Sequence, residues 1–289
     1  MLNSGYAWLV GSWCARLWLP SGAMASSDAE SLLRWPDVIA AGLALVGSVA
    51  GLWAATATMG GVGLTEASAL FWMMLSTTDY GHAGCVTVVS MSLVLAFRLT
   101  CSRSCIHHRS HSVAVLILLA IFGVTRASMG HAGEAGFWSM ALAVETVHLW
   151  AIGLWAGVVA VSGWQVLHPT SWARLNIDER HYLERMSRAA MVAVVAIAAT
   201  GLYNAWLRVG TVEHLLDSSY GMTLLVKIAL VCIAIALGGY NKVIGLPAAS
   251  RSPQGLKQVR AVLQVESLVL LGVLAAAAIL TVQQPPSAI

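Results

Sequence analysis

The chain has 289 residues, of which 58% are hydrophobic and 10% charged, and its mean hydropathy is +0.76. Soluble domains carry about 25% charged residues, so this composition excludes an ordinary soluble protein and indicates an integral membrane protein. The formal net charge of +3 is small and spread over the connecting segments, which gives no reason to expect nucleic acid as a partner.

Long apolar segments follow one another along the chain, and a helix needs about 20 such residues to cross a bilayer. The expected spans are, in chain order, residues 5–19, 36–57, 81–97, 112–124, 137–166, 189–207, 222–243 and 262–282. Since only helices and closed barrels satisfy the backbone in lipid, these runs predict an all-α, polytopic transmembrane bundle of about eight helices. The fourth span is short, and we expect it to take in Thr125 and Ala127, with Arg126 reaching toward the interface.

The first span admits two interpretations. The stretch Ala23-Met24-Ala25 after it resembles a signal-peptidase site, and a start upstream of Met1 is a further alternative. No basic stretch precedes the apolar run, however, and Arg16 interrupts it, which favours a retained helix. We therefore separate residues 1–30, a first helix or signal-like segment, from a transmembrane domain over residues 31–289.

Basic residues predict the orientation of the bundle. They gather in three segments, which follow the third, fifth and seventh spans: Arg98, Arg103 and Arg109; Arg174, Arg180, Arg185 and Arg188; and Lys242, Arg251, Lys257 and Arg260. The alternate segments, 58–80, 125–136 and 207–221, hold few lysines or arginines. Because positively charged loops stay in the cytoplasm, both termini are expected to be periplasmic.

The fifth span contains the stretch "ETVHLWAIGLWAG", which places Glu145 and His148 three residues apart on one helix face. A charged group at membrane depth costs about 2.5–3.5 kcal/mol and usually faces the bundle interior or a water-filled path. A site inside the bundle and a structural hydrogen-bonded pair are equally good interpretations. Lys227 and Glu266 stand near the ends of the last two spans, where either side chain can reach the interface.

Histidines and methionines gather on the side that we expect to be periplasmic. Imidazole and thioether ligands together suit copper, and thioethers favour Cu(I). The candidate metal ligands are His148, His131, Glu145, Met129, His82 and Met222. Packing is the alternative role for each methionine, helix-end capping is the alternative for His82 and His131, and His214 is expected to be a plain loop residue.

The five cysteines, at positions 14, 85, 101, 105 and 232, do not form a secreted disulfide framework. Cys101 and Cys105 precede His107, His108 and His111, which suggests a cytoplasmic metal site. Their spacing is not C-x-x-C, however, and arginines between them repel a cation, so a positively charged loop is the better interpretation.

Several of these motifs resemble the copper resistance protein D (CopD) family of bacterial inner-membrane proteins. In residues 185–242 the matching features are Ser187-Arg188, Thr200-Gly201, Tyr220-Gly221, Lys227 and the Gly-x-Asn sequence at 239–241. In the fifth span the matching residues are His148, Trp155 and Gly157, and Val158 follows where a second glycine is usual. Before that span, His131 in "MGHAG" matches. The stretch "STTDYGHAG" also matches, with His82 at a position where a basic or aromatic residue is usual. The resemblance covers most of residues 32–284 and is strongest over 137–242.

The resemblance implies a non-enzymatic protein of the bacterial inner membrane that moves copper ions, often beside a periplasmic partner of the copper resistance protein C type. No phosphate-binding G-x-x-x-x-G-K-[ST] loop supports ATP-driven pumping by this chain. The first alternative is a bis-histidine haem b electron carrier, for which His82, His131 and His148 supply two axial ligands. The second is a membrane scaffold or sensor that docks a periplasmic copper protein without transport.

Overall fold

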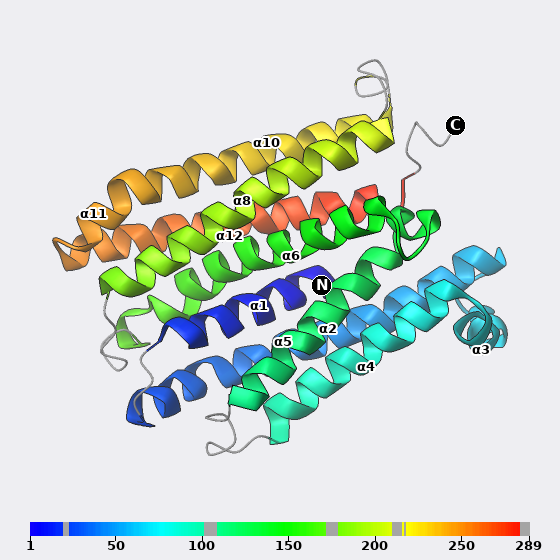
Figure 1. Cartoon of the computed structure of the whole chain (residues 1–289), viewed down its shortest axis with the longest axis horizontal. Helices are drawn as coiled ribbons and strands as arrows, with labels where there is room; N and C mark the ends of the chain where they lie inside the picture. Colours follow the sequence, from blue (N-terminus) through cyan, green and yellow to red (C-terminus); the bar gives the residue numbers. More distant parts are fainter. Residues whose placement is uncertain (20–22, 101–108, 172–178, 210–215, 217, 284–289) are drawn as a thin grey trace.

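The structure is a computed structural model that describes residues 1–19, 23–100, 109–171, 179–209, 216 and 218–283, and Figure 1 shows it as a bundle of long helices. Across these ranges the chain is all-α. Seven helical segments there are long and apolar enough to cross a membrane: Glu30–Gly60, Asp79–Thr100, Ser110–Ser128, Met140–Val166, Arg180–Leu207, Ser219–Ala249 and Pro253–Leu280. The prediction of a polytopic helix bundle is therefore confirmed.

The bounds of the elements differ from the expected spans mainly at their ends. In chain order they are α1 Leu2–Trp18, α2 Ala23–Gly60, α3 Ala67–Thr77, α4 Asp79–Thr100, α5 Arg109–Ser128, η1 His131–Ala135, α6 Met140–Val161, η2 Ser162–Val166, α8 Glu179–Val209, α10 Ser219–Tyr240, η3 Asn241–Gly245, α11 Leu246–Ala249 and α12 Pro253–Leu280. The segment 58–80, expected as a loop, contains the short apolar helix α3. Helix α5 does extend through Thr125 and Ala127, as expected.

Serine side chains cap the N-terminal ends of three of the described helices. The Ser139 hydroxyl accepts a hydrogen bond from the Leu142 amide at the start of α6, Ser218 accepts one from Gly221 at α10, and Ser252 accepts one from Gly255 at α12. Each bond satisfies one of the amides that lack a partner in the first helical turn. Helices α6 and α10 both end in a π-turn, η2 and η3, next to α12.

Helix α1 lies in the middle of the bundle, between α6 and α2 (Figure 1). One face of it joins a buried cluster with α6, α8 and α12, to which it contributes Ala7 and Cys14. The other face joins a second cluster with α2, α4 and α5, to which it contributes Tyr6 and Leu9. The first apolar segment is thus a helix that both halves of the bundle share.

Glycines allow α1 and α6 to touch backbone to backbone. A Cβ atom at Gly157 would overlap the carbonyl oxygen of Ala7, and one at Gly11 would overlap the carbonyl group of Gly157. A Cβ at Gly153 would lie 2.7 Å from the Tyr6 ring. Small residues four apart are typical of close helix contacts in membranes, and here they fix the distance between the two helices.

Four charged side chains tie α1, α2 and α4 together at one end of the bundle. Asp37, which is fully buried, lies 2.8 Å from Nη1 of Arg16 and 3.2 Å from Nε of Arg98. Glu30 lies 3.1 Å from Nε of Arg16, so two arginines face two carboxylates. Arg34 donates to the carbonyl oxygens of Arg98 and Leu99, which satisfies the end of α4.

The close contact of α1 and α6 predicts that Gly157→Leu destabilises the fold, because no rotamer removes a clash with the neighbouring backbone. Overpacking typically costs about 1–3 kcal/mol, and here the helices must separate. We expect a lower melting temperature and lower yield in detergent. Gly42→Ala on α2 is the control: nothing lies within 4 Å of its added Cβ, so stability should hold or rise. Equal stability of both variants would contradict the contact.

The buried ion cluster predicts that Asp37→Asn lowers the free energy of unfolding by about 3–5 kcal/mol, because it leaves two arginines facing one carboxylate in a buried site. Thermal denaturation followed by circular dichroism measures this. The control is Glu184→Gln, which removes an exposed carboxylate that pairs with Arg180 and Arg188 and should leave the transition unchanged. A similar transition for the two variants would show that the cluster is not structural.

Candidate metal site

The two polar residues that stand out in the fifth span both face α8. Nδ1 of His148 lies 2.8 Å from the Thr200 hydroxyl, and the Asn204 amide donates to Oε2 of Glu145 at 2.9 Å. Thr200 and Asn204 are four residues apart and lie on one face of α8, as Glu145 and His148 do on α6. The result is a polar contact between two apolar helices, in which His148 is buried and Glu145 is partly buried.

The bonds of Thr200 define the tautomer of neutral His148. The Thr200 hydroxyl lies 2.6 Å from the carbonyl oxygen of Ala196, to which it donates its single proton. It must therefore accept from Nδ1–H of His148, which leaves the lone pair on Nε2. A histidine that binds a metal through one nitrogen usually donates its other N–H to such a partner, so the bond to Thr200 holds this imidazole in an orientation that suits a metal ligand.

His131 and Met129 lie before α6, in and near the short helix η1. Nδ1 of His131 lies 3.3 Å from Oε1 of Glu134, and its Nε2 is buried with no hydrogen-bond partner in the part of the chain that the structure describes. The sulfur of Met129 lies 3.8 Å from the Thr87 hydroxyl on α4. Both residues thus present an atom that can coordinate a soft or borderline metal.

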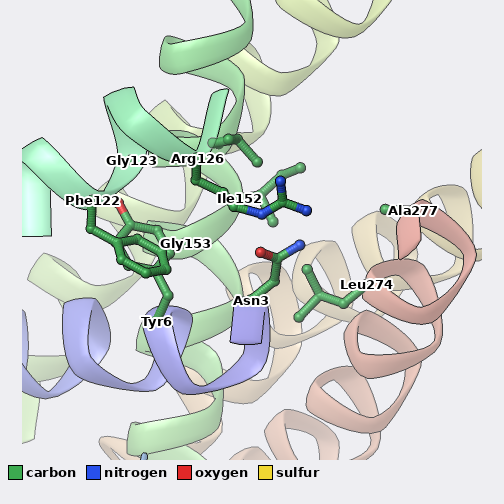
Figure 2. Close-up of a pocket in the computed structure, with 10 residues that line it drawn as sticks. Asn3, Tyr6, Phe122, Gly123, Arg126, Ile152, Gly153, Leu274 and Ala277 are labelled. Atoms are coloured by element: carbon green, nitrogen blue, oxygen red, sulfur yellow. The ribbon is translucent and has the colours of Figure 1, made fainter. Parts of the chain in front are cut away.

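Arg126 lies between two cavities at this end of the bundle. One, of about 160 Å³, has Ser48, Tyr80, Thr87 and Met129 among its lining residues. The other, of about 30 Å³, is almost entirely apolar, and Figure 2 shows the guanidinium of Arg126 in it, beside the amide of Asn3. Arg126 also lines the Met129 cavity, so its positive charge weakens the binding of a copper ion there.

The remaining candidates are placed apart from these groups. His82 is exposed, and its Nε2 lies 3.1 Å from the carbonyl oxygen of Ser76, so it links α4 to the end of α3. Met222 is 54% exposed in the first turn of α10. His214, and Cys101 to His108, fall outside the described residues. Among those described, no three His, Cys, Asp or Glu side chains form a cluster that could hold a metal ion.

One buried group did not emerge from the sequence as a site residue. Glu266 on α12 does not reach the interface: it is 1% exposed, and its Oε1 accepts a hydrogen bond from the Trp155 indole at 2.9 Å. Its sequence position, about one turn into an expected span, suggested a shallower place. Helix α12 in fact begins at Pro253, so Glu266 lies nearly four turns inside it.

Comparisons with known proteins agree with these helices and motifs. Residues 1–140 match the family described as Copper resistance protein D-like, N-terminal domain, and residues 180–280 match Copper resistance protein D. The copper resistance protein D of Pseudomonas syringae pv. tomato is 27% identical over 193 residues, which are 62% of this chain and 58% of that relative. No solved structure matches the chain. The chain belongs to the copper resistance protein D family of membrane copper-handling proteins.

Proposed function

We propose that this protein moves copper ions across the bacterial inner membrane, from the periplasm toward the cytoplasm. The observation that supports this most directly is the buried His148, oriented by Thr200 so that its Nε2 carries the lone pair, one turn from Glu145. A buried imidazole and a partly buried carboxylate are costly in lipid, and a role in copper handling accounts for their presence.

Each residue of the pair has a distinct role in this proposal. His148 takes the ion through Nε2, and imidazole suits either copper valence, while Met129 and His131 offer a soft thioether and a second imidazole for Cu(I) near the expected periplasmic side. Glu145, held by Asn204, offsets the positive charge of the ion. Because an ion in transit must leave each site, we expect weak binding with few ligands rather than a closed cage.

Delivery of copper belongs to the same proposal. The basic loops predict both termini and η1 on the periplasmic side. In that orientation His131 and Met129 lie where a periplasmic copper carrier of the copper resistance protein C type would release its ion. A scaffold or sensor without transport would also bind such a carrier. Copper flux into vesicles therefore separates the two functions, since only the transporter carries the ion across.

We expect His148→Ala to abolish most copper uptake by cells and copper binding by the detergent-purified protein, because it removes the oriented imidazole. Thr200→Val keeps the ligand but removes its hydrogen-bond partner, and we expect roughly a tenfold weaker affinity. His168→Ala is the matched control, since His168 lies beyond η2, away from His148, and bonds Thr170 there. Unchanged uptake in His148→Ala, at normal expression, would refute the role of this residue.

The haem alternative makes a separate spectroscopic prediction. Axial ligation requires two histidines from facing helices, whereas His148 faces α8 and His82 is exposed beside α3. We expect purified protein to show no Soret band. A Soret band that disappears in His148→Ala would replace the copper proposal with electron transfer.

A further inference from the structure

A carboxyl group lies deep in the bundle, away from the residues discussed for copper binding. Glu266 is 1% exposed, between Trp155 of α6 and Gly238 of α10. A Cβ atom at Gly238 would lie 3.3 Å from Oε1 of Glu266, so the missing side chain leaves room for the carboxyl group. Among the described residues, the Trp155 indole is the one hydrogen-bond donor to it.

No cation neutralises this carboxyl group in the part of the chain that the structure describes. The nearest basic residue earlier on its own helix, Arg260, donates to the carbonyl oxygen of Gly163. On α6, the titratable residues Glu145 and His148 face α8. On α10 and η3, Cys232 is exposed, Lys227 precedes Gly238 by eleven residues, Tyr240 bonds Gln258 and Lys242 contacts Met191. On α1, Tyr6 stacks on Phe122, Cys14 is buried in the core cluster and Arg16 belongs to the ion cluster.

Burial therefore favours the uncharged form of Glu266. An ionised carboxylate needs several hydrogen bonds or a cation to replace its hydration, and a single neutral indole does not replace it. A carboxylic acid costs far less to bury. Glu266 is thus expected to hold a proton while no copper ion is bound inside the bundle.

The position of Glu266 connects it to the copper site. His148 and Trp155 of α6 and Ser162, the first residue of η2, are spaced seven residues apart, so they follow one side of this continuous helical segment. Their polar contacts are with Thr200, Glu266 and Tyr182, respectively. Seven residues of helix rise about 10.5 Å. An ion that leaves His148 toward η2 along this face next passes the level of Trp155 and Glu266.

We propose that Glu266 is a proton-exchange site for copper, an inference that rests on the proposed transport. When the copper ion arrives, its positive charge favours the ionised carboxylate: the O–H bond breaks, the electron pair stays on the carboxyl oxygen, and the proton passes to water. When the ion leaves, a proton from water returns. For Cu(I), the net charge at this level of the bundle is zero both without the ion, when the carboxyl group is protonated, and with it, when the carboxylate faces the cation. Neither state therefore carries the cost of a buried unpaired charge.

The first test needs no copper. Infrared spectra of the full-length protein in detergent at neutral pH should contain a carboxylic-acid C=O band that Glu266→Gln removes and Glu66→Gln, on the exposed α2–α3 connection, retains. A band unchanged in Glu266→Gln would overturn the proposal. If that variant does not fold, Trp155→Phe takes its place: loss of the indole donor should shift the band to higher frequency, and an unshifted band would overturn the proposal.

The second test adds Cu(I) to weakly buffered protein and measures proton release with a pH indicator dye. Wild type should release about one proton more per bound copper than Glu266→Gln, with Glu66→Gln like wild type. Equal release at equal copper binding would overturn the exchange. Absence of copper binding by wild type would instead refute the proposed transport and with it the exchange, leaving the infrared result to decide whether Glu266 holds a proton.

Discussion

The backbone contact between α1 and α6 at Gly11 and Gly157 is the constraint on which the rest of the bundle depends. Helix α1 belongs to both buried clusters, one with α6, α8 and α12 and the other with α2, α4 and α5. Any side chain larger than hydrogen at these two glycines would push α1 away from α6, and α1 would then lose its contact with one of the two clusters. The ion cluster around Asp37 then holds the same helix to α2 and α4.

This contact also fixes how α6 presents its polar residues. With one face of α6 held against α1, the opposite side meets α8 and α12, where three of its polar side chains find partners: Glu145 and His148 on α8, and Trp155 on α12. Hydrogen bonds between apolar helices are worth about 0.6–2 kcal/mol each in membranes, so they orient the side chains more than they hold the helices together. The candidate site is thus a consequence of helix packing.

Much of the fold could be predicted from the sequence, because lipid permits few structures and a long apolar run is a strong signal. Helical periodicity also placed Glu145 and His148 on one face, which is confirmed. Periodicity cannot name the neighbour across that face, so Thr200 and Asn204 as partners required the structure. The depth of Glu266 was underestimated because α12 begins well before the apolar run of residues from which that span was predicted. Helix α3 was missed because a short apolar helix resembles a loop of mixed composition. The metal role of the six candidate residues stays a prediction.

The π-turn η2 at the end of α6 has a mechanical consequence. Arg260 and Gln264 of α12 both donate to the carbonyl oxygen of Gly163 within that turn, at 3.2 and 3.3 Å. A widened turn frees main-chain oxygens for side chains, and here it couples the end of α6 to α12. Any separation of α6 from α12 at this end of the bundle must therefore break both of these bonds.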